Sequence, residues 1–437
     1  MIEAVSDFFS RHNFVRHVAI ETTVDALLHD MQNGLHGKAS DQDMIRTFIN
    51  PPEKSPCGKS VIVIDAGGTN FRSCLVTFDE AGMPSIDLLQ KTSMPGVGTQ
   101  LSRTEFFDAI AKNIEHLKDK ADAIGFCFSY AMKITEDGDG TLIMFSKEVN
   151  APEVIGSKIG ACLQEALARH GWKKNVRITL LNDTVAALLA GAAAPAAGKK
   201  YSSYIGLILG TGLNAAYIQS KIDSAAARAN PSGFEKQIIV CESGKFSHIA
   251  LSDFDKAADG KTLNQKTYLI EKQSSGAYLG AVAHEVLVAA ANEKLLSEQC
   301  AHRIAALQSL SLIEFDSFLH APFLAHSTIG TIAAECATAR DYDILFELLD
   351  SVAERSARHA AAVLAACVIQ SGAGTSASKP VCIVCNGSTY YKTHGIARRV
   401  QGYLEEVLTA ERGLYWETIS VEHDITLGAA IGGLARL

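Results

Sequence analysis

The stretch VIVIDAGGTNFRSCLVTF, residues 61–78, decides the fold of this chain. An apolar run reaches Asp65, the chain turns through residues 66–70, and a second apolar run follows. This pattern predicts two strands joined by a tight turn. Glycines in such a turn let the backbone approach a ligand and present N–H groups with no Cβ in the way. The stretch therefore predicts a phosphate-binding hairpin, with an ordinary glycine hairpin as the alternative.

Two further glycine turns support the phosphate interpretation. Residues 204–218, YIGLILGTGLNAAYI, repeat the pattern of a strand, a glycine turn and a strand. The sequence NGST at residues 386–389 follows the apolar strand expected at residues 381–385 and opens a helix, whose N-terminus favours anions. Two hairpin-bearing α/β halves predict a duplicated architecture that holds a nucleotide between them.

Composition excludes several classes of protein. The chain has 437 residues, of which 47% are hydrophobic, and a formal net charge of −8. This length favours two domains, and the negative charge argues against a partner that is a nucleic acid or an anionic membrane. The N-terminus lacks the apolar region of a secretory signal, and no run approaches the roughly 18 apolar residues of a membrane span. Ten scattered cysteines favour reduced thiols in the cytoplasm.

Cys382 and Cys385 form a CxxC pattern, but strand alternation separates the two sulfurs, which argues against zinc. The acidic loop at residues 135–140 is interpreted as a turn rather than a calcium loop, because Leu142 stands where that loop needs glycine. Periodicity predicts a largely helical segment at residues 1–57 and helices at residues 153–170 and 267–290.

The strand expected at residues 176–181 ends in Asn182, Asp183 and Thr184 before an alanine-rich helix. Asp183 or Thr184 can cap this helix. A carboxylate at the C-terminal end of a strand is also where α/β proteins place their chemistry. Both roles for Asp183 are therefore considered.

An ordered set of motifs extends from about Gly58 to the C-terminus and resembles the hexokinase family, within the actin/Hsp70/sugar-kinase fold. The motifs are IDAGGTNFR, FCFSY, FSKEV, LLNDTVAAL, GLILGTGLNA, CESGKF, EKQSSGAYLG, NGSTYYK and LGAAIGGLARL. The resemblance implies a duplicated ribonuclease-H-like two-domain α/β fold, with mixed five-stranded sheets flanked by helices and a cleft between the lobes. It implies an N-terminal helical segment at residues 1–57 packing on the large domain, a small domain at 58–181 completed by 428–437, and a large domain at 182–427.

The resemblance implies ATP-dependent phosphorylation of a hexose at its 6-hydroxyl, which is the first step of glycolysis. Asp183 is the implied general base and Lys147 the second catalytic residue. The implied sugar-binding residues are Ser129, Ser146, Lys147, Asn182, Asp183, Asn214, Glu242 and Glu271. The implied nucleotide-binding residues are Asp65, Gly67, Gly68, Thr69, Asn70, Arg72, Gly210, Thr211, Gly212, Gly387, Ser388, Thr389 and Gly428. Asp65 would hold Mg²⁺ through water.

Alternatives remain open for single residues and for the whole chain. Arg72 is also interpretable as a surface or domain-packing arginine, and Glu242 and Glu271 as solvated carboxylates. Glucose is the first sugar expected, with mannose, fructose or an amino sugar as alternatives. A sugar sensor with little turnover and an actin/Hsp70-like ATPase are the other function classes. The expected oligomeric state is a monomer or a homodimer.

The chain departs from the family pattern near the predicted sugar site. The departures are Tyr130, Ala131, Phe145, Glu148, Ser243 and the segment EHDIT at residues 422–426. They leave Asp183 and both glycine hairpins intact, so they affect the expected sugar preference and adenine pocket rather than catalysis. Changes of this kind are worth roughly 1–3 kcal/mol of discrimination between sugars.

Overall fold

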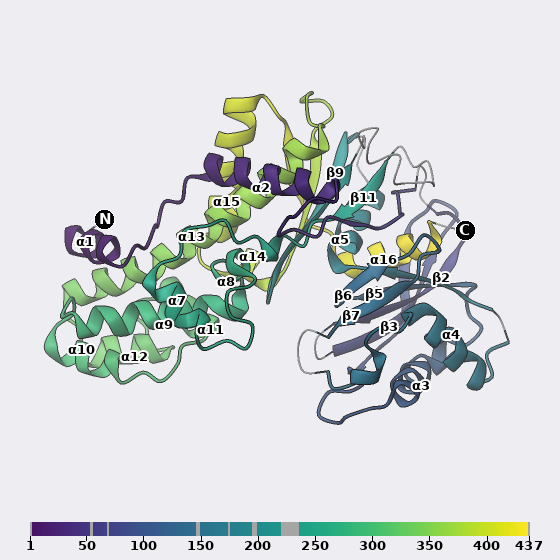
Figure 1. Ribbon diagram of the computed structural model, residues 1–437, viewed down its shortest axis with the longest axis horizontal. Coiled ribbons are helices and arrows are strands. Elements are labelled where there is room, and N and C mark those ends of the chain that lie inside the picture. Colours follow the sequence, from purple (N-terminus) through teal and green to yellow (C-terminus); the bar gives the residue numbers. More distant parts are fainter. Residues whose placement is uncertain are drawn as a thin grey trace.

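Two mixed sheets with the same strand pattern organise the molecule (Figure 1). The computed structural model describes residues 2–52, 56–67, 70–145, 149–173, 175–194, 199–219 and 236–435. The first sheet has the order β4 (Pro84–Ser93), β3 (Asn70–Phe78), β2 (Ser60–Ala66), β5 (Ala123–Phe128) and β8 (Arg177–Leu181). The second has the order β1 (Ile45–Arg46), β11 (Gln237–Val240), β10 (Leu213–Gln219), β9 (Ser203–Leu209), β12 (Val381–Asn386) and β13 (Trp416–Ile419).

The strand directions show the duplication. In the first sheet β4, β3 and β2 are antiparallel and β5 and β8 run parallel to β2. In the second, β11, β10 and β9 are antiparallel and β12 and β13 run parallel to β9. Both predicted glycine hairpins, β2–β3 and β9–β10, are therefore confirmed.

The second sheet has six strands rather than the expected five. The extra strand β1 comes from the N-terminal segment and pairs antiparallel with β11, with Ile45 opposite Val240. Its two residues are too few to show strand alternation in the sequence. Pairing gives the exposed edge of β11 a hydrogen-bonding partner.

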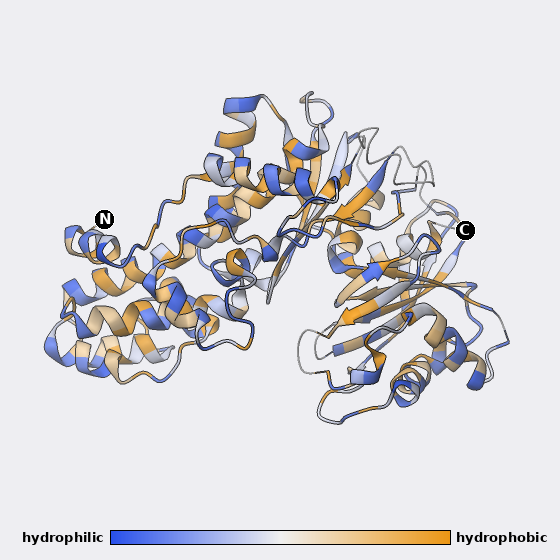
Figure 2. Cartoon of the chain, viewed as in Figure 1, coloured by the Kyte–Doolittle hydropathy of each residue, from blue (hydrophilic) through white to orange (hydrophobic). Residues whose placement is uncertain are grey.

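The remaining elements cover the sheets and form a helical body. The elements on the first sheet are α3 (Arg103–Asn113), α4 (Ile159–Arg169) and the ribbon β6 (Ala131–Ile134) and β7 (Gly140–Met144). The second sheet packs against α2 (Ile20–Leu35), α13 (Ala339–Ser371) and α15 (Ile396–Leu404). The helical body contains α1 (Glu3–Arg11), α7 (Asp253–Asp259), α9 (Gly276–Asn292), α10 (Glu298–Ala305), α11 (Leu312–His320), α12 (Thr328–Cys336) and the first half of α13. Short helical elements are η1 (Glu115–Leu117), η2 (Pro152–Val154), η3 (Ser243–Lys245), α8 (Leu269–Lys272), α14 (Ser388–Lys392) and η4 (Glu405–Ala410). Figure 2 shows hydrophobic residues along the strands and many hydrophilic residues on the outer helices.

Two helices join the sheets. Helix α5 (Asp183–Ala193) packs on β9 and β12, and α16 (Asp424–Leu434) packs on α5, β2 and β5. One buried cluster contains residues of both sheets and both helices. Glycines allow this close approach, because a Cβ on Gly428 would lie 1.7 Å from the Ala186 carbonyl oxygen. A Cβ on Gly125 would lie 1.9 Å from the Ala429 carbonyl oxygen.

Three local expectations need correction. The helix expected at residues 153–170 begins only at Ile159, because Gly156 adopts a φ of 81° and breaks it. The helix expected at residues 267–290 is interrupted between α8 and α9. Asn182, not Asp183 or Thr184, is the N-cap of α5, since its side chain accepts from the Thr184 N–H at 2.9 Å.

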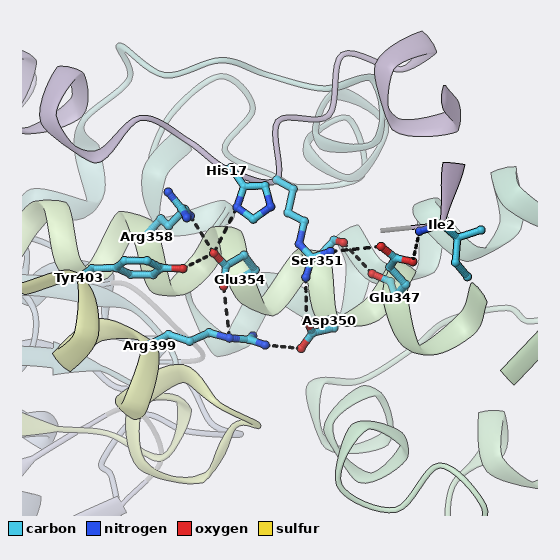
Figure 3. Close-up of polar contacts among 10 residues, drawn as sticks. Ile2, His17, Glu347, Asp350, Ser351, Glu354, Arg358, Arg399 and Tyr403 are labelled. Atoms are coloured by element: carbon cyan, nitrogen blue, oxygen red, sulfur yellow. Dashed lines mark hydrogen bonds and ion pairs between the residues drawn. The ribbon is translucent and has the colours of Figure 1, made fainter. Parts of the chain in front are cut away.

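A network of ion pairs ties the N-terminal segment and α15 to α13 (Figure 3). Arg16 donates to Asp350 at 3.0 Å and to Glu347 at 3.4 Å. Arg399 contacts Asp350 at 2.6 Å and Glu354 at 3.2 Å. Asp350 and Glu354 are largely buried, and each contacts more than one positively charged side chain, which offsets the cost of burying its charge.

All ten cysteines lie in the described ranges and are free thiols. Cys382 and Cys385 belong to clusters on opposite faces of β12, as strand alternation predicts. Among the described helices, none has both the length and the apolar character needed to cross a membrane.

Substitution of Gly125 tests the close packing of α16 on β5. Gly125→Ala should lower the free energy of unfolding by about 1–3 kcal/mol, because the new Cβ meets backbone that cannot rotate away. Chemical denaturation measures this loss. Gly402→Ala is the matched control, since nothing lies within 4 Å of a Cβ there, and it should stabilise α15 by up to about 1 kcal/mol. Wild-type stability in Gly125→Ala would contradict the packing argument.

Candidate active site

Two other carboxylates, Asp183 and Asp424, affect the ionisation of Asp65 at the junction of the two sheets. Asp65 lies at the end of β2 and accepts from the Arg72 guanidinium at 3.2 Å. Burial raises the pKa of Asp65, and the Arg72 charge opposes this shift. The negative charges of Asp183 and Asp424 raise the pKa further, so both carboxylates lie near Asp65. A region with this concentration of negative charge favours a cation.

The described ends of the first glycine turn contact the link that follows β5. The Gly67 N–H donates to the Asn70 carbonyl at 3.1 Å and closes the turn. The Ser129 N–H donates to the Ala66 carbonyl at 3.2 Å, and the Tyr130 hydroxyl donates to the Gly67 carbonyl at 2.6 Å. The structure therefore brings the predicted sugar residue Ser129 beside the predicted phosphate turn. The residues Gly68, Thr69, Ser146, Lys147 and Glu148 lie outside the described ranges.

The second glycine turn lies against the turn that follows β12. The Thr389 hydroxyl donates to the Gly210 carbonyl at 2.8 Å, and the Gly210 N–H donates to the Gly212 carbonyl at 3.0 Å. Gly387 has a φ of 121°, and a Cβ there would lie 2.2 Å from the Leu209 carbonyl oxygen. Two turns predicted to contact one nucleotide are thus adjacent in space. Thr211 and Ser388 are exposed beside them.

The predicted sugar residues of the second lobe gather next to the second turn. Asn214 donates to Glu242 at 3.0 Å through its side-chain amide. Glu271, carried by α8, accepts from the Leu213 N–H at 2.8 Å. A Cβ on Gly212 would lie 2.7 Å from a Glu271 carboxylate oxygen, so this carboxylate lies against the turn itself.

Glu242 has an unusual backbone and an unusual acidity. Its φ is 57°, a left-handed conformation that non-glycine residues rarely adopt. Burial raises its pKa from 4.5 to about 7, and the charges of Asp43 and Asp183 add to the shift, whereas Lys245 opposes it. Strained and electrostatically perturbed residues cluster at functional sites.

Asn182 and Glu242 line one small cavity, together with Tyr130 and the β1 residue Ile45. This cavity brings together a predicted residue that follows a strand of the first sheet and one that follows a strand of the second. Asp183 occupies the first turn of α5 and accepts from the Thr184 N–H at 2.9 Å. Gly428, predicted to lie near the nucleotide, is buried against α5.

Sequence reasoning missed two residues of this region. Asp424 is buried at the start of α16, and both of its carboxylate oxygens accept from the Asn386 amide at 2.8 Å. Tyr130 contributes the hydroxyl that reaches the first turn. An acid at a helix N-terminus and a polar residue at the end of a strand are weak signals on their own. Both residues fall in segments that depart from the family pattern.

Comparisons with known proteins agree with this arrangement. Two models of the hexokinase family match the chain, one over residues 7–193 and one over residues 204–435. Hexokinase-1 of Spinacia oleracea is 26% identical over 450 residues, which cover 94% of this chain and 86% of that protein. A solved hexokinase from Schistosoma mansoni, complexed with glucose, has a TM-score of 0.79 at 24% identity and covers 100% of this chain and 98% of that chain. A second solved hexokinase has a TM-score of 0.80 at 20% identity, over 99% of this chain and 100% of that chain. The fold class expected from the sequence is confirmed.

The raised pKa of Glu242 predicts a pH-dependent stability. A carboxyl that is harder to ionise when folded contributes stability below pH 4.5, and this contribution is lost as the pH rises toward 7. Glu242→Gln removes the ionisable group. The melting temperature of the variant minus that of wild type should therefore be larger at pH 8 than at pH 5. Thermal denaturation of the unliganded protein at both pH values measures this difference.

Asp341→Asn is the control for this pH dependence. Burial acts to raise the pKa of Asp341, but hydrogen bonds from Ser297 and Thr338 outweigh it, and the pKa is lowered. Asp341 is therefore ionised at both pH values, and its substitution should cost the same stability at pH 5 and pH 8. If the melting-temperature difference between Glu242→Gln and wild type were also the same at pH 5 and pH 8, the pKa of Glu242 would be ordinary.

Proposed function

We propose that this chain, which belongs to the hexokinase family and phosphorylates a hexose with ATP, acts on the 6-hydroxyl of the sugar. We propose glucose as the first sugar and hexose 6-phosphate, the product of the first step of glycolysis, as the product. The observation that carries this proposal is the adjacency of the Asn214–Glu242 pair, Glu271 and the second glycine turn. A carboxylate accepts from a sugar hydroxyl and an amide donates or accepts, so the group suits a polyhydroxy ligand.

Asp183 is the proposed general base. Asp183 directly follows Asn182 at the end of β8, and it is the Asn182 side chain that caps α5. A carboxylate at this edge of the sheet accepts the proton of a hydroxyl group as that hydroxyl attacks phosphorus. The new bond joins the sugar oxygen to the γ-phosphorus, the bond between the γ-phosphorus and the bridging oxygen breaks, and ADP leaves. Lys147, the other proposed catalytic residue, would donate to the sugar or the phosphate.

The nucleotide is proposed to lie across the glycine turns. Their N–H groups suit phosphate oxygens, and the turn that starts at Gly387 suits the nucleoside. Asp65 fits a hydrated Mg²⁺, because burial and two neighbouring carboxylates disfavour its ionised form unless positive charge is near. Bound Mg²⁺ would neutralise part of the phosphate charge. Arg72 already contacts Asp65 and is placed to share this role.

The domain boundaries expected from the sequence stay a proposal. The small lobe would comprise residues 58–181 with 428–437, and the large lobe residues 182–427 with the N-terminal segment packed on it. Support comes from α5 and α16, which join the two sheets where these segments meet. Closure about this junction would exclude water, which competes with the sugar as a nucleophile.

Substitution of Asp183 tests the general base. Asp183→Ala should lower the turnover rate by about 10²–10⁴-fold, because alanine cannot accept the proton of the sugar hydroxyl. The affinity for the sugar, measured by calorimetry without nucleotide, should stay within a few-fold of wild type. Asp253→Ala is a matched control, since Asp253 also occupies the first turn of a helix and is exposed on α7. A retained turnover rate in Asp183→Ala would refute the assignment.

A substrate panel tests the activity itself. ADP release from Mg·ATP should depend on the added sugar, and glucose should rank first against mannose, fructose, glucosamine and N-acetylglucosamine. A coupled enzyme assay measures this rate. Sugar binding without turnover would instead indicate a sensor. ATP hydrolysis that is indifferent to sugar would indicate an ATPase of the wider actin/Hsp70 fold.

A further inference from the structure

The link between β5 and β6 passes next to the first glycine turn. Strands β2 and β5 are parallel neighbours, with Ala66 opposite Phe128, so both leave the sheet at the same edge (Figure 1). The Ser129 N–H donates to the Ala66 carbonyl at 3.2 Å and extends this pairing by one residue. The chain then reaches Tyr130, which is buried at 3% exposure.

The Tyr130 hydroxyl connects this link to the turn. It donates to the Gly67 carbonyl at 2.6 Å, while the Gly67 N–H donates to Asn70 at 3.1 Å. Gly67 is therefore held through both of its backbone polar groups. A peptide unit is planar, so fixing a carbonyl also fixes the plane of its peptide group.

Aromatic packing fixes the Tyr130 ring. Its centroid lies 4.7 Å from that of Phe128 and 5.1 Å from that of Phe145, which it meets edge-on at 83°. Burial raises the pKa of the phenol, so the hydroxyl remains a donor at physiological pH. Phe145 directly precedes the segment that contains the predicted sugar residues Ser146 and Lys147.

Tyr130 also lines the small cavity that Asn182 and Glu242 line. Tyr130 thus contacts the phosphate turn, follows Ser129 in the chain and borders the predicted sugar residues Asn182 and Glu242, which follow strands of different sheets. No other residue in the described ranges both hydrogen-bonds to Gly67 through its side chain and lines this cavity.

We propose that Tyr130 is a positioning residue that couples hexose binding to the placement of the ATP phosphates. The proposal rests on the proposed function of the site. A sugar that contacts Ser129 shifts the backbone at Tyr130, the next residue, and the packed ring carries this shift to the Gly67 carbonyl through its hydrogen bond. The phosphate turn then binds nucleotide more tightly when the sugar is present. Such coupling is reciprocal, so nucleotide also tightens sugar binding.

The test is Tyr130→Phe, which keeps the ring and removes the hydroxyl. Calorimetry measures the Kd of Mg²⁺ with a non-hydrolysable ATP analogue, with and without saturating glucose. Wild type should bind the analogue more tightly with glucose, and Tyr130→Phe should lose about fivefold of this enhancement, which is the typical effect of one neutral hydrogen bond. The Kd for glucose alone should change less than twofold, and kcat/KM for ATP should fall about fivefold.

Tyr217→Phe is the matched control. The Tyr217 hydroxyl is also buried and donates to Gln219 at 2.7 Å, within the second sheet. Its removal should lower the melting temperature and leave the effect of glucose on nucleotide binding unchanged.

Three results would overturn the inference. The first is that glucose tightens analogue binding equally in Tyr130→Phe and Tyr217→Phe, and the second is that glucose does not tighten analogue binding in wild type. The third is that Tyr130→Phe loses as much affinity for glucose alone as it loses for the analogue. Failure of the proposed function is distinguishable from these results. It would appear as an absence of sugar-dependent ADP release in wild type, whereas the binding measurements need no turnover.

Discussion

The close contact of α16 with α5 and β5 is the constraint on which the site depends. Gly428 and Gly125 let backbone meet backbone, at separations where a single Cβ would lie under 2 Å from a carbonyl oxygen. Side chains at these points would push the two sheets apart. Because α5 starts at Asp183 and α16 at Asp424, the same packing places both carboxylates near the end of β2. The geometry of the site therefore follows from the absence of two side chains, at Gly125 and Gly428, where α16 meets β5 and α5.

This packing has an electrostatic cost. Asp65 and Asp424 are both harder to ionise than ordinary aspartates because of burial, and Asp65 also faces the negative charges of Asp183 and Asp424. Glu242 combines a left-handed backbone with a pKa raised to about 7. Such groups oppose folding and persist because the surrounding structure determines their positions. Ligands that bring positive charge or hydroxyl donors would offset this cost, so binding and stability are linked at the site.

The sequence predicted the fold through local patterns and failed where the cause was tertiary. Both hairpins were predictable because glycine turns and apolar runs are local signals, and the duplicated strand pattern confirms them. The sixth strand was not predictable, because β1 has two residues and exists through its pairing with β11.

The motifs located Asn214, Glu242 and Glu271, which the structure brings together around the second turn. They missed Asp424, whose partner Asn386 is 38 residues away in the sequence, and Tyr130, whose hydroxyl reaches a carbonyl 63 residues away. Hydrogen bonds of this kind depend on strand register, and they produce no repeating pattern in the sequence.

Duplication of the sheet has not produced two equivalent turns. The first turn and the second occupy the same position in their sheets, between antiparallel strands beside a parallel neighbour. The second is held by Thr389 and Glu271, which come from the elements predicted to contact the nucleoside and the sugar. The first is contacted by Tyr130, from the link that carries Ser129. Each turn is therefore tied to a segment predicted to bind sugar, but through different chemistry: a carboxylate at one turn and a phenol at the other. The two halves of this duplicated fold therefore hold corresponding glycine turns with different side chains, one through the Glu271 carboxylate that accepts from the Leu213 N–H and the other through the buried Tyr130 hydroxyl that donates to the Gly67 carbonyl.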